Sequence, residues 1–138
     1  MNQICLSTTF TADQSPLKQA LEICEQAMIT TVEVGSNHCY ENDYSYVKDY
    51  SFEYLVHNYF PVPKESFVVN LSSLDEIIHK KSIKHIKSSI RFCAEIGAKL
   101  YTFHPGFLTD PKGSNQSSKN YDFQSVSYTH LTLPTKRI

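Results

Sequence analysis

The sequence has no excess of charge of either sign. It contains 13 Lys and Arg against 14 Asp and Glu in 138 residues, which gives a formal net charge of −1. Nucleic-acid binding through counterion release needs a basic stripe or patch. Because acidic and basic side chains are mixed along the chain, we expect no long-range attraction to DNA.

Paired cysteines and long apolar runs are also missing. The four cysteines form no Cys-x-x-Cys motif and lie mostly in apolar stretches, which disfavours a disulfide framework or structural zinc and favours a reducing compartment. The first residues show no basic segment followed by an apolar one. No apolar run approaches the roughly 18 residues of a membrane helix. We therefore expect a cytoplasmic protein without a membrane partner.

The first half of the chain predicts the order strand, helix, strand. Residues 4–10 are rich in β-forming side chains and predict a first strand. Apolar side chains then recur with the spacing of one helix face, at Leu17, Ala20, Leu21, Cys24 and Met28, after the helix-starting Pro16. Residues 30–35 predict a second strand, and the tyrosine-rich residues 36–52 predict a long loop with room for a short irregular helix.

The second half predicts two further strands around a long helix. Residues 54–57 predict a third strand, and after a loop with two prolines residues 67–71 predict another extended segment. Ser73 and Glu76 have the spacing of a capping box, which predicts a helix that ends at Gly97. We expect its buried face to contain Ile78, Ile83, Ile86, Ile90, Cys93 and Ala94. Residues 100–104 predict a fourth strand.

This alternation of strands and helices is typical of an α/β fold with a parallel sheet. An open doubly wound sheet and a closed eight-stranded barrel both begin in this way, and periodicity does not separate them. In either case ligands bind at the carboxyl ends of the strands.

Two of the six histidines lie at such strand ends. His57 and His104 each end an apolar strand and precede a proline-containing loop. Two imidazoles on neighbouring strand ends suit a zinc or manganese site completed by carboxylates. The alternative, which position alone favours, is that each imidazole only hydrogen-bonds a loop.

Glu33 and the aromatic residues leave similar choices open. Glu33, the one charged residue of the second strand, is either paired with a neighbouring strand or serves as a ligand or base, because an unpaired buried charge is costly. Tyr59, Phe60 and the tyrosine loop either stack on sugar faces or pack internally. We expect His79 and His85 to be solvated on the lysine-rich helix, and His38 has no visible partner.

Four motifs, in this order, resemble the xylose-isomerase-like barrel superfamily. They are His57-Asn58-Tyr59-Phe60-Pro61, Asn70-Leu71-Ser72-Ser73, Gly97-Ala98 and Phe103-His104-Pro105-Gly106. The superfamily includes sugar-phosphate isomerases and epimerases and the apurinic endonuclease IV family (AP endonuclease family 2). The resemblance covers the chain from about residue 3 to about residue 110.

The resemblance implies the N-terminal part of a (β/α)8 barrel within residues 1–125, with about four strands present. It implies that His57 and His104 are metal-binding histidines for zinc or manganese. We expect Glu33, Tyr59 and Asn70 to bind substrate, whereas no residue is assigned as the general base.

The function implied first is that of a metal-dependent sugar or sugar-phosphate isomerase or epimerase. The chain departs from the endonuclease pattern in its longer stretch between His57 and Asn70 and in its lack of a basic surface, which favours a small polyhydroxylated substrate over DNA. A zinc phosphodiesterase acting on abasic DNA is the second interpretation, because it explains both histidines better. A barrel remnant that binds a ligand without catalysis is the third.

Residues 126–138 fit neither a helix nor a strand of the barrel. They resemble translated adapter sequence at the ends of unrelated assembled sequences, and we interpret them, His130 included, as a non-native tail. Removing Lys136 and Arg137 changes the formal charge from −1 to −3. Because the later carboxylate ligands of the family would be missing, we expect this chain to be inactive and to self-associate.

Overall fold

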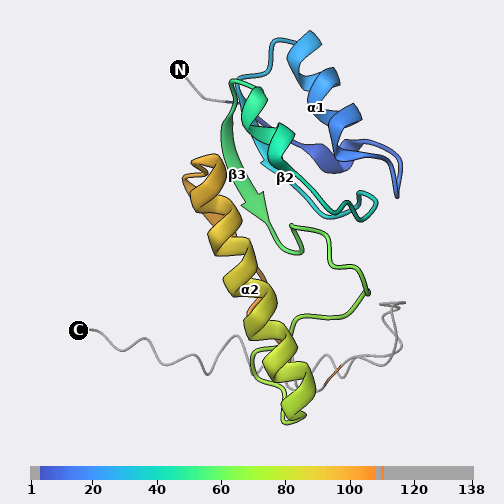
Figure 1. Cartoon of the computed structure of the whole chain (residues 1–138), viewed down its shortest axis with the longest axis vertical. Helices are drawn as coiled ribbons and strands as arrows, with labels where there is room; N and C mark the ends of the chain where they lie inside the picture. The colour runs from blue at the N-terminus through green and yellow to red at the C-terminus, as the bar shows by residue number, and fades with distance from the viewer. Residues whose placement is uncertain (1–3, 108–109, 111–138) are drawn as a thin grey trace, which may run out of the picture. The chain divides into compact units, whose positions relative to one another are not determined.

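The structure is a computed structural model that describes residues 4–107 and residue 110. Its elements, in chain order, are β1 (Cys5–Ser7), η1 (Thr8–Phe10), α1 (Leu17–Gln26), β2 (Thr31–Val34), η2 (Ser45–Asp49), β3 (Glu53–His57), α2 (Glu76–Ile96) and β4 (Leu100–Thr102) (Figure 1). Of the described residues, 4–65 and 85–103 form a first compact unit, and 66–84, 104–107 and 110 belong to a second. The proposed tail at residues 126–138 lies outside the described residues.

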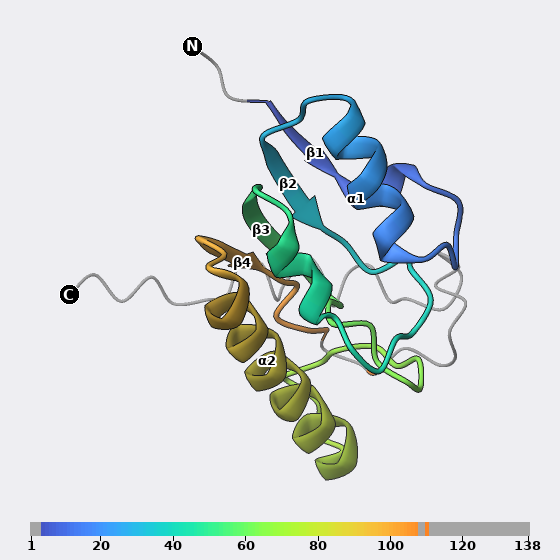
Figure 2. The same ribbon diagram turned by 45° about the horizontal axis from the view of Figure 1, so that its top comes forward.

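The four strands form one parallel sheet in the sequential order β1-β2-β3-β4. A doubly wound sheet reverses its strand order at a switch point and carries helices on both faces. Here α1, η2 and α2 all contribute to one core on one face of the strands (Figure 2). Sequential order with helices on a single face is the arrangement of a barrel wall. The expected α/β class is confirmed, and the sheet selects the partial barrel over the open sheet.

Alternation along the strands separates the two faces of this sheet. Val32, Val34, Tyr54 and Val56 are buried against the helices. Every second residue between them points to the opposite face, because successive side chains of a strand alternate. That opposite face holds Ser7, Glu33, Leu55 and Leu100 in one row of the register, with His57 and Thr102 paired in the next. In a closed barrel this face lines the interior.

Helix α1 begins after Pro16, as its sequence predicts, but Pro16 offers no side-chain cap. The N–H of Leu17 instead donates to Glu41 Oε1 from the tyrosine-rich loop, at 3.3 Å. At the other end Met28 adopts a left-handed φ of 56°, and the N–H of Ile29 donates to the carbonyl of Cys24 at 3.0 Å. Helix α1 therefore ends in a Schellman motif without glycine.

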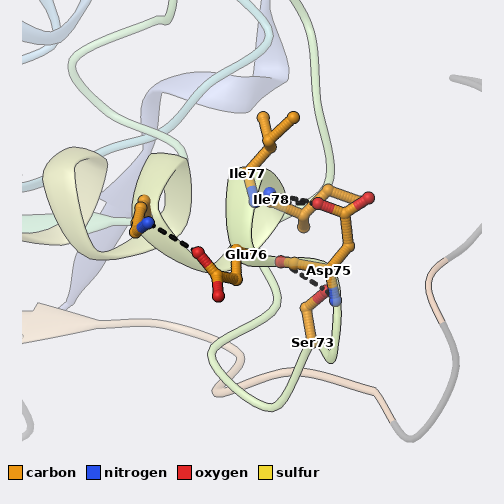
Figure 3. Close-up of polar contacts among 6 residues, drawn as sticks. Ser73, Asp75, Glu76, Ile77 and Ile78 are labelled. Carbon is orange, nitrogen blue, oxygen red and sulfur yellow. Dashed lines mark hydrogen bonds and ion pairs between the residues drawn. The ribbon is translucent and has the colours of Figure 1, made fainter.

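The predicted capping box of α2 is wrong. Asp75 is the cap: its Oδ1 accepts from the N–H groups of Ile77 at 2.8 Å and Ile78 at 3.2 Å (Figure 3). Glu76 does not serve as the box partner, because it pairs with Lys80 at 2.7 Å. An aspartate caps two free N–H groups directly, so no reciprocal glutamate is needed.

The end of α2 is as predicted. Gly97 has a φ of 70°, and the N–H of Ala98 donates to the carbonyl of Cys93 at 2.8 Å. This 6→1 bond is the Schellman arrangement that a glycine favours.

The buried face of α2 differs from the expected one. Ile90 is 54% exposed and Ala94 is exposed, whereas Ser82, His85 and Ser89 are buried. The serine hydroxyls donate to carbonyls one turn earlier, at 2.8 Å for Ser82 and 3.1 Å for Ser89, so burying them leaves no donor unpaired. The buried face of α2 thus includes serines whose hydroxyls are hydrogen-bonded within the helix, and hydrophobicity alone does not predict these positions as buried.

Two of the expected strands are shorter than predicted. The first ends at Ser7, because residues 8–10 form η1, and the fourth ends at Thr102 and not at His104. Residues 67–71, predicted as an extended segment, pair with none of the described strands: the N–H of Asn70 donates to Ser82 Oγ at 2.9 Å and that of Leu71 to the carbonyl of Pro105 at 3.0 Å. These two backbone N–H groups donate to a side chain and to a loop carbonyl, and not to a neighbouring strand. The short helix expected in the tyrosine-rich loop is present as η2.

Candidate active site

His57 lies at the carboxyl end of β3, on the sheet face opposite the helices. Its Nδ1 lies 2.7 Å from Thr102 Oγ1, the residue paired with it in the β3–β4 register. The N–H of the next residue, Asn58, donates to the carbonyl of Thr102 at 2.9 Å. When Nδ1 carries the proton and donates it to Thr102 Oγ1, Nε2 is the nitrogen with the lone pair that a metal needs. The geometry of His57 therefore fits the ligand role that the sequence predicts for it.

Glu33 lies on the same face one register row before His57, which corresponds to about 7 Å along the strand direction. It is half-buried and paired in register with Ser7 and Leu55. Burial, and then the negative charge of Glu33, raise the pKa of the Cys5 thiol. The other carboxylate of this face, Glu53, forms an ion pair with Lys99 at 2.9 Å.

The aromatic residues after β3 have separate environments. Phe60 is buried in the core between Tyr44 and Phe92, with ring centroids 4.7 Å and 5.1 Å away, so it does not face a sugar. Tyr59 is half-buried, with its ring 6.0 Å from that of His85. Substrate binding by Tyr59 stays a prediction.

The remaining predicted residues belong to the second unit. His104 is exposed and lies two residues past β4. Asn70 is buried and hydrogen-bonded on both side-chain atoms, with Oδ1 accepting from the N–H of Phe107 at 3.0 Å and Nδ2 donating to Asp110 at 2.7 Å. Because His57 belongs to the first unit, joint metal binding by the two histidines stays a prediction, as does contact of Asn70 with substrate.

His85 is buried and not solvated as expected, and His38, for which the sequence shows no partner, has two. His38 is fully buried, with Nε2 2.8 Å from Thr8 Oγ1 and Nδ1 3.2 Å from the carbonyl of Ser15. Thr8 Oγ1 also accepts from the N–H of Gly35 at 3.0 Å. Burial lowers the pKa values of both His38 and His85. No local pattern reveals this role of His38, because Thr8 lies thirty residues earlier in the chain.

A complete metal site is not formed by residues 4–107 and 110, among which no three His, Cys, Asp or Glu side chains are grouped to hold an ion. An imidazole nitrogen is a donor that suits zinc or manganese, so His57 is a candidate ligand, and its binding of a metal stays a prediction. The described residues thus fit part of a ligand set. None of the helices in this part of the chain is long and apolar enough to span a membrane.

Sequence comparison assigns the fold family. The profile of the "Xylose isomerase-like TIM barrel" family matches residues 44–126, which is more than half of the chain. The chain belongs to this family. It is also 29% identical over 86 residues to "Probable endonuclease 4" of Aquifex aeolicus (strain VF5), an alignment covering 60% of this chain and 28% of that protein. No solved structure matches the chain significantly.

The family assignment agrees with the wall of parallel strands and with the side chains at their ends. Barrels of this kind bind ligands at the carboxyl ends of the strands. In the first unit that end is occupied by the His57–Thr102 pair. The chain spans less than a third of the length of the endonuclease relative, so activity concerns the complete protein.

Proposed function

We propose that the complete protein is a divalent-metal enzyme that isomerises or epimerises a sugar or sugar phosphate. The observation that carries this proposal is the shared position of His57 and Glu33 on the sheet face that lines a barrel, with His57 at its carboxyl end. A bound zinc or manganese ion would polarise a carbonyl or hydroxyl of the substrate. We assign the proton transfer at the adjacent carbon to Glu33, because the other carboxylate of this face, Glu53, is paired with Lys99.

The charge of the strands supports a small substrate. β1, β2, β3 and β4 contain no lysine or arginine, and their only acidic side chains are Glu33 and Glu53. A phosphodiester backbone is held by several cationic contacts. A polyhydroxylated substrate instead needs hydroxyl and carboxylate partners, and this face carries Ser7, Thr102 and Glu33.

Phosphodiester cleavage at abasic DNA is the second candidate. It is favoured by the similarity to "Probable endonuclease 4" and by the paired histidine motifs around His57 and His104. Such an enzyme should bind duplex DNA with an affinity that falls steeply as salt rises.

The deciding experiment uses the complete protein loaded in turn with Mn²⁺, Co²⁺ and Zn²⁺. It is incubated in D₂O with a panel of aldose and ketose phosphates, and NMR follows both interconversion and deuterium entry at carbon. We expect metal-stimulated exchange that Glu33→Gln reduces by about a hundredfold or more. Glu53→Gln, on the same face, is the matched control and should retain activity.

Absence of interconversion with every metal would count against the isomerase. Metal-dependent cleavage of a duplex with one abasic site, with salt-sensitive binding, would establish the second candidate instead. Metal binding without either reaction would support a non-catalytic barrel.

A further inference from the structure

Asn70 has all of its polar atoms engaged within the second unit. It is fully buried, and its backbone N–H donates to Ser82 Oγ at 2.9 Å. Its side-chain Oδ1 accepts from the N–H groups of Ser72 and Phe107, each at 3.0 Å. Its Nδ2 donates to Asp110 Oδ1 at 2.7 Å. One side chain therefore ties the turn before α2 to two points of the segment after β4.

Asp110 completes this connection with its second oxygen. Ser73 Oγ donates to Asp110 Oδ2 at 2.6 Å, so the carboxylate receives a hydrogen bond on each oxygen. Hydrogen bonds to an ionised acceptor are shorter and stronger than neutral ones. Both donors come from the same turn, and the carboxylate cannot move without losing one of them.

The backbone between His104 and Phe107 fits closely against Asn70. Gly106 has a φ of 148°, and a Cβ at this position would collide with Asn70 Oδ1 and lie 3.3 Å from Asn70 Cα. The N–H of Leu71 donates to the carbonyl of Pro105 at 3.0 Å. Only glycine allows this approach with this φ. The shape of the segment after His104 is thus set by its contacts with Asn70 and Leu71.

We propose that Asn70 and Asp110 form an amide–carboxylate clamp that fixes the His104–Phe107 backbone and so orients His104. Both are positioning residues. The link to metal binding rests on the function proposed above, whereas the clamp itself rests on the hydrogen bonds of the second unit. Contact of Asn70 with substrate, which the sequence favours, is the competing role.

The test exchanges the two members of the clamp in the complete protein. Asn70→Asp keeps the size of the side chain but replaces its donor with an oxygen facing the carboxylate of Asp110. Asn70→Asp combined with Asp110→Asn restores a donor opposite an acceptor with the order reversed. Asn42→Asp, an exposed asparagine in the first unit, is the matched control for the added charge. Amide hydrogen exchange at Phe107 and Leu71 reports the clamp, and zinc affinity by chelator competition reports its consequence.

We expect Asn70→Asp to accelerate exchange at Phe107 by about tenfold or more and to weaken zinc binding by about tenfold to a hundredfold, as loss of an outer supporting contact does. The reversed pair should recover most of both. Asp110→Asn alone should show the same changes in weaker form, and it decides the matter if Asn70→Asp does not fold.

The clamp is overturned if Asn70→Asp behaves like Asn42→Asp in both measurements, or if the reversed pair recovers neither. A higher KM at unchanged zinc affinity and exchange would assign Asn70 to substrate and also overturn it. If the unsubstituted complete protein binds no zinc, the proposed function fails, while exchange at Phe107 still decides the clamp.

Discussion

Thr102 Oγ1 lies 2.7 Å from His57 Nδ1, and the two residues are register partners on β4 and β3. We expect Thr102→Val to leave the sheet intact, because valine is isosteric and β-branched, while releasing the imidazole from its orientation. In the complete protein zinc affinity should fall by about tenfold or more. Thr102→Ser keeps the hydroxyl and is the control.

The measurements are chelator competition and the ¹⁵N shifts of the His57 ring, which report its tautomer. Equal zinc affinity and an unchanged tautomer ratio in Thr102→Val would show that the threonine hydroxyl does not orient His57.

His38 makes the stability of this chain depend on pH on the acid side. Burial lowers its pKa below the ordinary value of about 6.5, so between the two values the unfolded state binds a proton that the folded state does not. The contribution of neutral His38 to the free energy of unfolding is therefore fully present above about pH 6.5. It is lost as the pH drops from about 6.5 to the lowered pKa of the folded state, by at most about 1.4 kcal/mol per pH unit for one histidine.

Urea denaturation between pH 5 and 8 checks this expectation. His38→Gln should lower stability at pH 8, because a buried hydrogen-bonded group is lost, and should flatten the acid limb. Burial lowers the pKa of His85 in the same direction, so the double variant His38→Gln/His85→Gln should be flatter still. An acid limb of unchanged slope in both variants would contradict the assignment.

Glu41 acts as a cap for a helix that has none of its own. Its Oε1 accepts from the N–H of Leu17 and its Oε2 from Tyr46 OH at 2.9 Å. Burial and then this hydrogen bond raise the pKa of Tyr46. We expect Glu41→Ala to lower the free energy of unfolding by about 1–2 kcal/mol.

Tyr46→Phe removes only the second contact and should cost less, and Glu41→Gln keeps an acceptor for Leu17 and should lie between the two. Denaturant titration ranks the three variants. A Glu41→Ala variant as stable as the parent chain would mean that water caps α1 equally well.

Helices α1 and α2 both end at a residue in the left-handed conformation. This residue is Met28 after α1 and Gly97 after α2. Met28 is 86% exposed, so replacing it removes little packing. Met28→Gly should therefore stabilise the chain by about 1 kcal/mol, because glycine adopts this φ without a steric penalty. Gly97→Ala should destabilise it by a similar amount, since no atom lies within 4 Å of the added Cβ and the backbone alone is strained. Thermal melting of both variants tests the pair, and shifts of the same sign would contradict it.

Features that depend on short stretches of sequence were predicted well. The strands at Thr31–Val34 and Glu53–His57, the start of α1 after Pro16 and the Gly97 cap each depend on neighbouring residues. Periodicity did not separate the barrel from the open sheet. The resemblance of the four motifs predicted the barrel, and the sheet order, which depends on contacts between residues far apart in the chain, agrees with it.

The features that the sequence did not reveal depend on contacts between distant residues. His38 shows no partner in the sequence, because Thr8 and Ser15 reach it only in the folded chain. The hydrogen bond between Asn70 and Asp110 could not be predicted from a local pattern, because the two residues lie forty positions apart in the chain. Within the predicted site, His57 could be placed at a strand end from sequence, but its orientation by Thr102 required the β3–β4 register.

Residues 1–125, expressed alone, should associate through the open edges of the sheet. Among the described strands β1 pairs only with β2 and β4 only with β3, so each leaves an edge that a closed barrel would pair. The sheet face opposite the helices carries Leu55 and Leu100, of which Leu100 is 50% exposed. Unpaired edges beside apolar side chains promote association.

We expect this polypeptide to associate in a concentration-dependent way in sedimentation velocity and to show no isomerase activity. Leu100→Lys, which places a charge on the edge strand, should reduce association. Ile77→Lys, at a 77% exposed position on α2, adds the same charge outside the strands and should not. Zinc binding should be weak, because the described residues group no three metal-binding side chains. A monomer that melts sharply and binds zinc tightly would show that these strands form a complete domain and not part of a barrel wall.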